Sequence, residues 1–135
     1  MLRMSVTCPP YQPHPPHRDR SAGKSQWTIP EAAETVVFER AWDNGWVAGA
    51  VGWGIYAEDG EIALDLGISD DGERSLWWAK FVGKTDPWHG YPADLVRRQE
   101  HDAPAVSVAR AWHEAGHIDK VALSRIIRKQ PCRPS

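Results

Sequence analysis

Eight tryptophans in 135 residues constrain the fold of this chain more than any other feature. Each indole adds roughly 150–250 Å² of largely apolar surface and one N–H group that needs a hydrogen-bond partner. All eight lie between Trp27 and Trp112, and a helical pattern continues from there to Lys129. Together they predict one folded domain over residues 26–130, a length that buries a core without disulfides or metal.

The two ends of the chain differ from this domain in composition. Residues 1–25 hold five prolines among histidines and basic residues and have few apolar side chains. This composition predicts a disordered or polyproline-II tail, and a proline-rich ligand for an aromatic groove is the alternative. Residues 131–135 are predicted to be a second disordered end.

Cysteine use and hydropathy indicate the compartment. Cys8 and Cys132 lie near opposite ends of the chain, which suits a reducing environment. Glycine and acidic residues interrupt every apolar run well below the roughly 20 residues that a membrane span needs. The N-terminus lacks the apolar centre of a signal peptide. We therefore expect a cytoplasmic protein with no membrane partner.

The first element is predicted to be a helix that begins at Thr28 and ends near Trp42. Thr28 and Glu31 have the spacing of a capping box. Apolar residues recur at helical spacing and predict the buried face, whereas glutamates are expected on the solvent side. The apolar set is Ala33, Val36, Val37, Phe38, Ala41 and Trp42, and the glutamates are Glu31, Glu34 and Glu39.

The pattern then changes to a period of two. Residues 62–68 alternate between apolar and other side chains, as in a strand buried on one face. A glycine-rich strand over residues 46–56 precedes it, and a strand over residues 76–82 follows after a turn. These segments predict a three-stranded antiparallel meander.

Two helices are predicted at the C-terminal end. Asp102 and Pro104 open the first helix, which Gly116 ends, and Asp119 begins the second. The predicted fold class is therefore α+β, with an N-terminal helix, a small antiparallel three-stranded meander and two C-terminal helices.

One short motif carries specific chemistry. His113-Glu114-Ala115-Gly116-His117 matches the H-E-x-x-H pattern, in which two histidines one helical turn apart bind zinc. It resembles the zinc-binding pentapeptide of metalloproteases such as the membrane-anchored AAA proteases. The resemblance implies that His113 and His117 are zinc ligands and that Glu114 is the catalytic general base of a zinc-dependent hydrolase.

The same pentapeptide has a purely structural interpretation. Gly116 stands where the helix is expected to end, so the two histidines do not share one unbroken turn. His113 is then a half-exposed helix residue, and His117 is a C-terminal residue favoured by the helix dipole. With this interpretation the protein has no cofactor and no catalytic residue.

The segment from Asp86 to Pro92 is the second candidate site. Trp88, His89 and Tyr91 lie between two prolines in a predicted loop, where binding groups are often placed. With Trp78 of the preceding strand they form the predicted binding set. The alternative is that Trp88 and Tyr91 fold back over the edge of the sheet.

Charge is distributed unevenly along the chain. Residues 31–73 hold eleven acidic residues and only one base, Arg40, whereas residues 116–135 hold five bases and only one acid, Asp119. The acidic part predicts a face for a protein partner, most suitably a basic one. The basic end faintly resembles the recognition helix of a helix-turn-helix, which makes DNA binding a further alternative.

These observations favour a small intracellular protein-interaction module without catalytic activity. It is expected to bind another protein through the aromatic loop and the acidic face. The zinc-dependent hydrolase is the first alternative and the DNA-binding protein the second.

Overall fold

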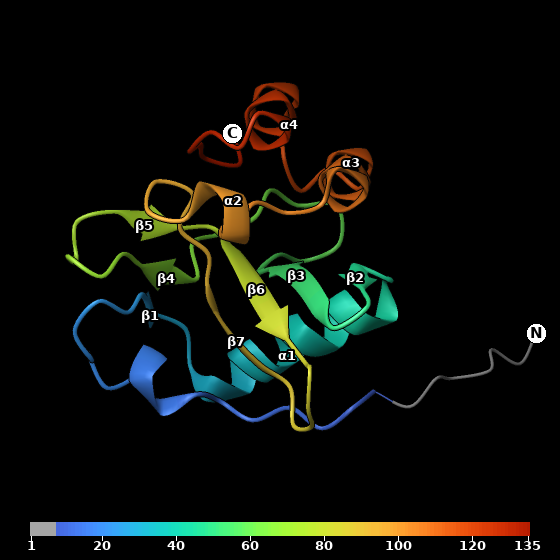
Figure 1. Ribbon diagram of the computed structural model, residues 1–135. Helices are drawn as coiled ribbons and strands as arrows, with labels where there is room; N and C mark the ends of the chain where they lie inside the picture. Colours follow the sequence, from blue (N-terminus) through green and yellow to red (C-terminus); the bar gives the residue numbers. More distant parts are fainter. Residues whose placement is uncertain (1–7) are drawn as a thin grey trace, which may run out of the picture.

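An N-terminal helix, two antiparallel sheets and two C-terminal helices make up the fold, so the predicted α+β class is confirmed (Figure 1). The computed structural model describes residues 8–135. The helices are α1 (Glu31–Asp43), α2 (Gln99–Asp102), α3 (Val106–Glu114) and α4 (Lys120–Ile127), preceded by a 3₁₀ turn, η1 (Pro15–His17). The strands are β1 (Gln26–Trp27), β2 (Val47–Ala48), β3 (Val51–Ile55), β4 (Gly67–Ile68), β5 (Ser75–Leu76), β6 (Trp78–Val82) and β7 (His89–Pro92). Within residues 8–135, no helix is long and apolar enough to cross a membrane.

The strands form two sheets in place of the single predicted meander. The larger sheet has the order β2-β3-β6-β7, and the smaller sheet has the order β1-β4-β5. Residues 62–68 contribute only the two-residue strand β4 and a single bridge between Tyr56 and Leu64. The predicted loop before Pro92 instead ends in β7, which pairs with β6 from His89 to Pro92.

One face of the larger sheet packs against α1. Gly52 and Gly90 lie opposite Phe81 in neighbouring strands, so all three share this face. A Cβ atom on Gly54 would come within 2.8 Å of Val37 in α1, and one on Gly90 would come within 2.3 Å of the Phe81 ring. Glycine is therefore required where α1 and the Phe81 ring approach the strand backbone.

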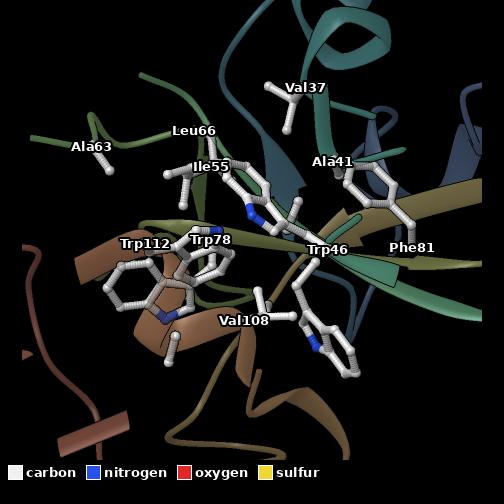
Figure 2. Packing of buried hydrophobic residues seen from close by; sticks show 14 of the residues in the cluster. Val37, Ala41, Trp46, Ile55, Ala63, Leu66, Trp78, Phe81, Val108 and Trp112 are labelled. Carbon is white, nitrogen blue, oxygen red and sulfur yellow. The ribbon is translucent and has the colours of Figure 1, made fainter. Parts of the chain in front are cut away.

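The opposite face packs against α3. Trp78 of β6 stacks on Trp112 of α3, with ring centroids 5.8 Å apart, and Trp46 meets the edge of the same indole at 5.9 Å. Figure 2 shows Trp78, Trp112 and Val108 on one side of the core, and Val37 and Ala41 of α1 on the other. The indole N–H groups of Trp53 and Trp112 are buried without a hydrogen-bond partner, which differs from the expectation that each indole finds one.

Both predicted tails contact the domain where the structure describes them. Tyr11 forms a bridge with Trp88, and its ring stacks on Phe38 of α1 at 4.8 Å. At the other end, the carbonyl of Pro134 accepts a hydrogen bond from the amide of Asp119. The first seven residues of the predicted N-terminal tail lie outside the described residues. The domain limits at residues 26 and 130 remain predictions that truncation can test.

Several local predictions differ from the structure. Pro30 is the N-terminal cap of α1 and has no side-chain cap bond, so Thr28 does not form the predicted capping box. Within α1, Glu34 is fully buried whereas Val36 is 45% exposed, which reverses their predicted faces. Asp119 does cap α4 as expected, because its carboxylate accepts a hydrogen bond from the amide of Ala122 at 2.8 Å.

Candidate functional site

The predicted aromatic binding set is mostly covered by the protein itself. Trp88 is only 5% exposed, and Trp78 is also buried. The Trp88 ring packs against Phe38 and Trp42 of α1, with ring centroids 5.5 and 5.9 Å away. In this structure neither indole is presented to a partner.

Tyr91 is partly buried between two other side chains. His17 stacks on its ring at 5.1 Å, and the guanidinium carbon of Arg98 lies 5.7 Å from the ring centroid. Its hydroxyl donates a hydrogen bond to Asp102 at 2.9 Å. Burial and the neighbouring Asp102 carboxylate raise the pKa of the Tyr91 phenol. The phenol therefore stays protonated at neutral pH and acts as a hydrogen-bond donor.

Tyr91 belongs to a network of buried charges that the sequence patterns did not indicate. Asp102 was predicted to cap a helix, but its buried carboxylate instead binds the Tyr91 hydroxyl and the backbone amide of Asp94. Asp94 is also buried and forms two 2.8 Å bonds to the guanidinium of Arg74. Burial raises the pKa of Asp94, but the bonds from Arg74 outweigh it and hold this pKa below its ordinary value.

A small polar pocket of about 130 Å³ opens beside this network. His17, Tyr91 and Asp102 line it together with residues of both charges. The basic side chains are Lys24, Arg97 and Arg98, and the acidic ones are Asp70, Asp94 and Asp102. Because the charges are balanced and Arg97 already pairs with Asp70 at 2.6 Å, the pocket has no strong preference for an anion or a cation.

The H-E-x-x-H residues do not lie on one helical turn. α3 ends at Glu114, and Gly116 has a φ of +84°, which turns the chain away before His117. His117 is buried, and its Nδ1 lies 2.7 Å from the carbonyl oxygen of Glu61, to which it donates. His113 is partly exposed and Glu114 exposed. Among residues 8–135, with the Glu100 side chain left aside, no three His, Cys, Asp or Glu side chains converge as a metal-ion site.

The acidic part of the chain contains a groove with exposed apolar side chains. The groove lies between α1 and residues 55–64, and its volume is about 110 Å³. Val36, Ile62 and Leu64 line it and are 45%, 40% and 57% exposed. Glu58 and Glu61 are acidic lining residues, and Arg40 is the basic one. We call this feature the acidic groove.

Besides the lining residues Glu58 and Glu61, exposed carboxylates lie along α1 and residues 58–65, at Glu31, Glu39, Asp43, Asp59 and Asp65. Arg40 is engaged locally, because its guanidinium donates to the carbonyl of Ala57 and lies 3.6 Å from Glu58. The lining of the groove therefore holds two carboxylates and one guanidinium that is already engaged.

The basic C-terminal helices pack as a pair. Five residues separate the end of α3 from the start of α4, more than the three or four residues typical of a helix-turn-helix. The basic side chains of α4 and the residue after it, Lys120, Arg125 and Arg128, are exposed. This arrangement leaves the DNA-binding alternative without additional support.

The chain matches no protein-family model, and comparisons with curated proteins and with solved structures found no similar protein.

Proposed function

We propose that this protein is a small interaction module that binds another protein through the acidic groove. The observation that carries the proposal is the exposure of Val36, Ile62 and Leu64 in a groove whose lining holds two carboxylates and one engaged guanidinium. Exposed apolar side chains grouped within a polar rim are typical of protein-binding sites.

The chemistry of the groove favours a basic partner with at least one protruding apolar side chain. An engineered cavity of roughly 150 Å³ holds a benzene ring, so a groove of about 110 Å³ has room for a small aliphatic side chain. Lysines or arginines beside that side chain would meet Glu58, Glu61 and the exposed acids nearby. The cytoplasmic location expected from the two free cysteines is part of this proposal.

Binding of a synthetic amphipathic Lys/Leu helix, measured by fluorescence anisotropy, tests the proposal. We expect this peptide to bind the wild-type protein more tightly than a Glu/Leu helix of the same pattern, and binding to weaken as salt is added. Leu64→Ser removes the most exposed apolar side chain and is expected to weaken binding about tenfold, a moderate interface effect.

A matched control is available on the opposite end of the chain. Val121 in α4 is 62% exposed and lies outside the groove, so Val121→Ser should leave the affinity for the Lys/Leu helix unchanged. Equal affinity for the two peptides, or equal effects of the two serine variants, would contradict the proposal.

A further inference from the structure

Three histidine side chains meet where the N-terminal segment crosses β7. The rings of His14 and His89 stack with centroids 5.1 Å apart, and those of His14 and His17 are 5.6 Å apart. His17 is buried, and His14 and His89 are partly buried. We call these three residues the histidine cluster.

The cluster lies between the other attachments of this segment. On one side, Gln12 donates its amide to the carbonyl of Trp88, and Trp88 donates its amide to the carbonyl of Pro10, both at 2.8 Å. On the other side, Arg18 forms a 2.7 Å ion pair with the buried Glu34 of α1. The imidazole contacts thus hold the middle of the segment to the domain.

Geometry also shows how the His17 ring is protonated. Its Nδ1 lies 2.8 Å from the carbonyl oxygen of Ser25, so Nδ1 carries a proton and donates it. When His17 is neutral, its Nε2 carries no proton. The His17 ring can then stack on Tyr91 and lie beside a neutral His14 ring without charge repulsion. Protonation of two adjacent rings, His14 with His17 or His14 with His89, places like charges at centroid distances of 5.6 or 5.1 Å.

We propose that the histidine cluster is a proton-sensitive clamp: its neutral rings hold residues 10–20 against β7, and protonation of the cluster releases this segment. The proposal is independent of the acidic groove. Release would uncover the Tyr91 face that His17 covers and the backbone of Trp88 to which residues 10–12 are bonded.

The charged groups around the histidine cluster do not offset the positive charge that protonation adds, so they favour release of the segment. Lys24, which follows residues 10–20, adds positive charge near His17, and Arg98 lies over Tyr91. Asp19 is the carboxylate that acts on His14, but it is exposed and is already bonded to Ser21. The Asp102 carboxylate is occupied by the Tyr91 hydroxyl and the Asp94 amide, and Glu34 by Tyr11 and Arg18. Asp70 and Asp94 line the same pocket as His17, but they are paired with Arg97 and Arg74.

The electrostatics give the direction of the pH effect. Burial lowers the pKa of His17 and of His89, and the neighbouring His14 lowers both further, although backbone carbonyls partly oppose the shift. The released segment therefore binds more protons than the docked one. Docking is favoured above the ordinary histidine pKa of 6.5 and weakens as the pH falls below it.

Amide hydrogen exchange measured by NMR tests the clamp in the full-length protein. The reporters are the amides of Gln12 and Trp88, which form the two bonds between the segment and the residue just before β7. After correction for intrinsic exchange, we expect their protection to fall about tenfold between pH 7.5 and pH 5.5, while the Trp53 amide, which bonds to Trp46 within the core, stays protected.

Two variants separate the clamp from a general loss of stability. His14→Gln removes the ring that neighbours both others, so Gln12 and Trp88 should lose less protection at pH 5.5 than in the wild type. His113→Gln, outside the cluster, should behave as wild type. If His14→Gln unfolds at pH 7.5, His89→Gln replaces it. Equal protection of the wild type at both pH values, or an equal loss in His14→Gln, would overturn the proposal.

Discussion

The hydroxyl of Tyr11 donates a hydrogen bond to the carboxylate of Glu34, a residue of α1 with no solvent exposure. Arg18 binds the other oxygen of the same carboxylate through its Nε at 2.8 Å. Burial raises the pKa of Glu34, and the bonds from Tyr11 and Arg18 offset part of that rise. Both partners of this buried acid therefore come from the N-terminal segment.

This relationship predicts the effect of removing residues 1–24. Glu34 would lose both partners, and breaking a buried ion pair by removing one side typically costs about 3–5 kcal/mol. We expect the truncated protein to be less stable than the full-length chain by about 3 kcal/mol in urea unfolding, in contrast to the sequence-based expectation that the tail is dispensable.

A second substitution shows whether Glu34 is the cause. Glu34→Gln removes the unpaired charge, so it should recover part of the lost stability in the truncated protein but destabilise the full-length chain. Unchanged stability after truncation would instead support the predicted domain limit at residue 26.

Glu34 also shows where sequence patterns reach their limit. The helical period correctly predicts α1, and charge alone assigns Glu34 to the solvent side. Its burial depends on Tyr11 and Arg18, which are 23 and 16 residues away and lie in a segment whose composition predicts disorder. The helical periodicity of α1 cannot reveal contacts with residues so far away in the sequence. The same periodicity places Val36 in the core, although it is exposed in the acidic groove.

The sheets show a related limit. Alternation over residues 62–68 predicts a strand, but only Gly67 and Ile68 pair in a ladder. Prolines at both ends of residues 87–92 predict a loop, yet Gly90 permits the close approach of Phe81 and the segment pairs with β6. The polar network around Asp102 joins residues from separate elements, so no motif could have revealed it.

Trp88→Ala separates a core role from a binding role for the predicted aromatic loop. Because Trp88 is buried against Phe38 and Trp42, we expect a loss of about 3–5 kcal/mol, as for other large-to-small core substitutions. Trp77 is only partly buried and provides the matched control. Trp77→Ala should lower the free energy of unfolding by less than Trp88→Ala does. Thermal unfolding measures both, and a Trp88→Ala protein as stable as wild type would restore the binding hypothesis.

The two histidines of the H-E-x-x-H motif should respond differently to substitution. His117→Ala removes a buried ring and its hydrogen bond to the Glu61 carbonyl, and the lost bond alone is expected to cost about 0.5–1.5 kcal/mol. His113→Ala is expected to stay within about 0.5 kcal/mol of wild type, as is usual for partly exposed positions without special contacts.

Metal content distinguishes this outcome from the zinc-hydrolase alternative. Protein purified without added metal is expected to hold no stoichiometric zinc by elemental analysis. One equivalent of zinc that disappears in His113→Ala would favour the hydrolase, with His113 and His117 as ligands and Glu114 as the general base.

The pair between Arg74 and Asp94 should make stability depend on pH. Arg74→Gln leaves a buried carboxylate without its cation, and we expect a loss of about 3 kcal/mol near neutral pH. Arg40→Gln is the matched control: Arg40 and its partner Glu58 are 41% and 77% exposed, so less than about 1 kcal/mol should be lost from that pair. The pKa of Asp94 in the folded protein lies below its ordinary value of 3.8, so the pair stabilises the fold above that pH and loses this effect as the pH falls through the folded pKa. The difference in unfolding free energy between wild type and Arg74→Gln should therefore shrink in acid. Urea titrations from about pH 7 to pH 2.5 measure this difference. If it stays constant over that range, Arg74 does not act by stabilising the charge of Asp94.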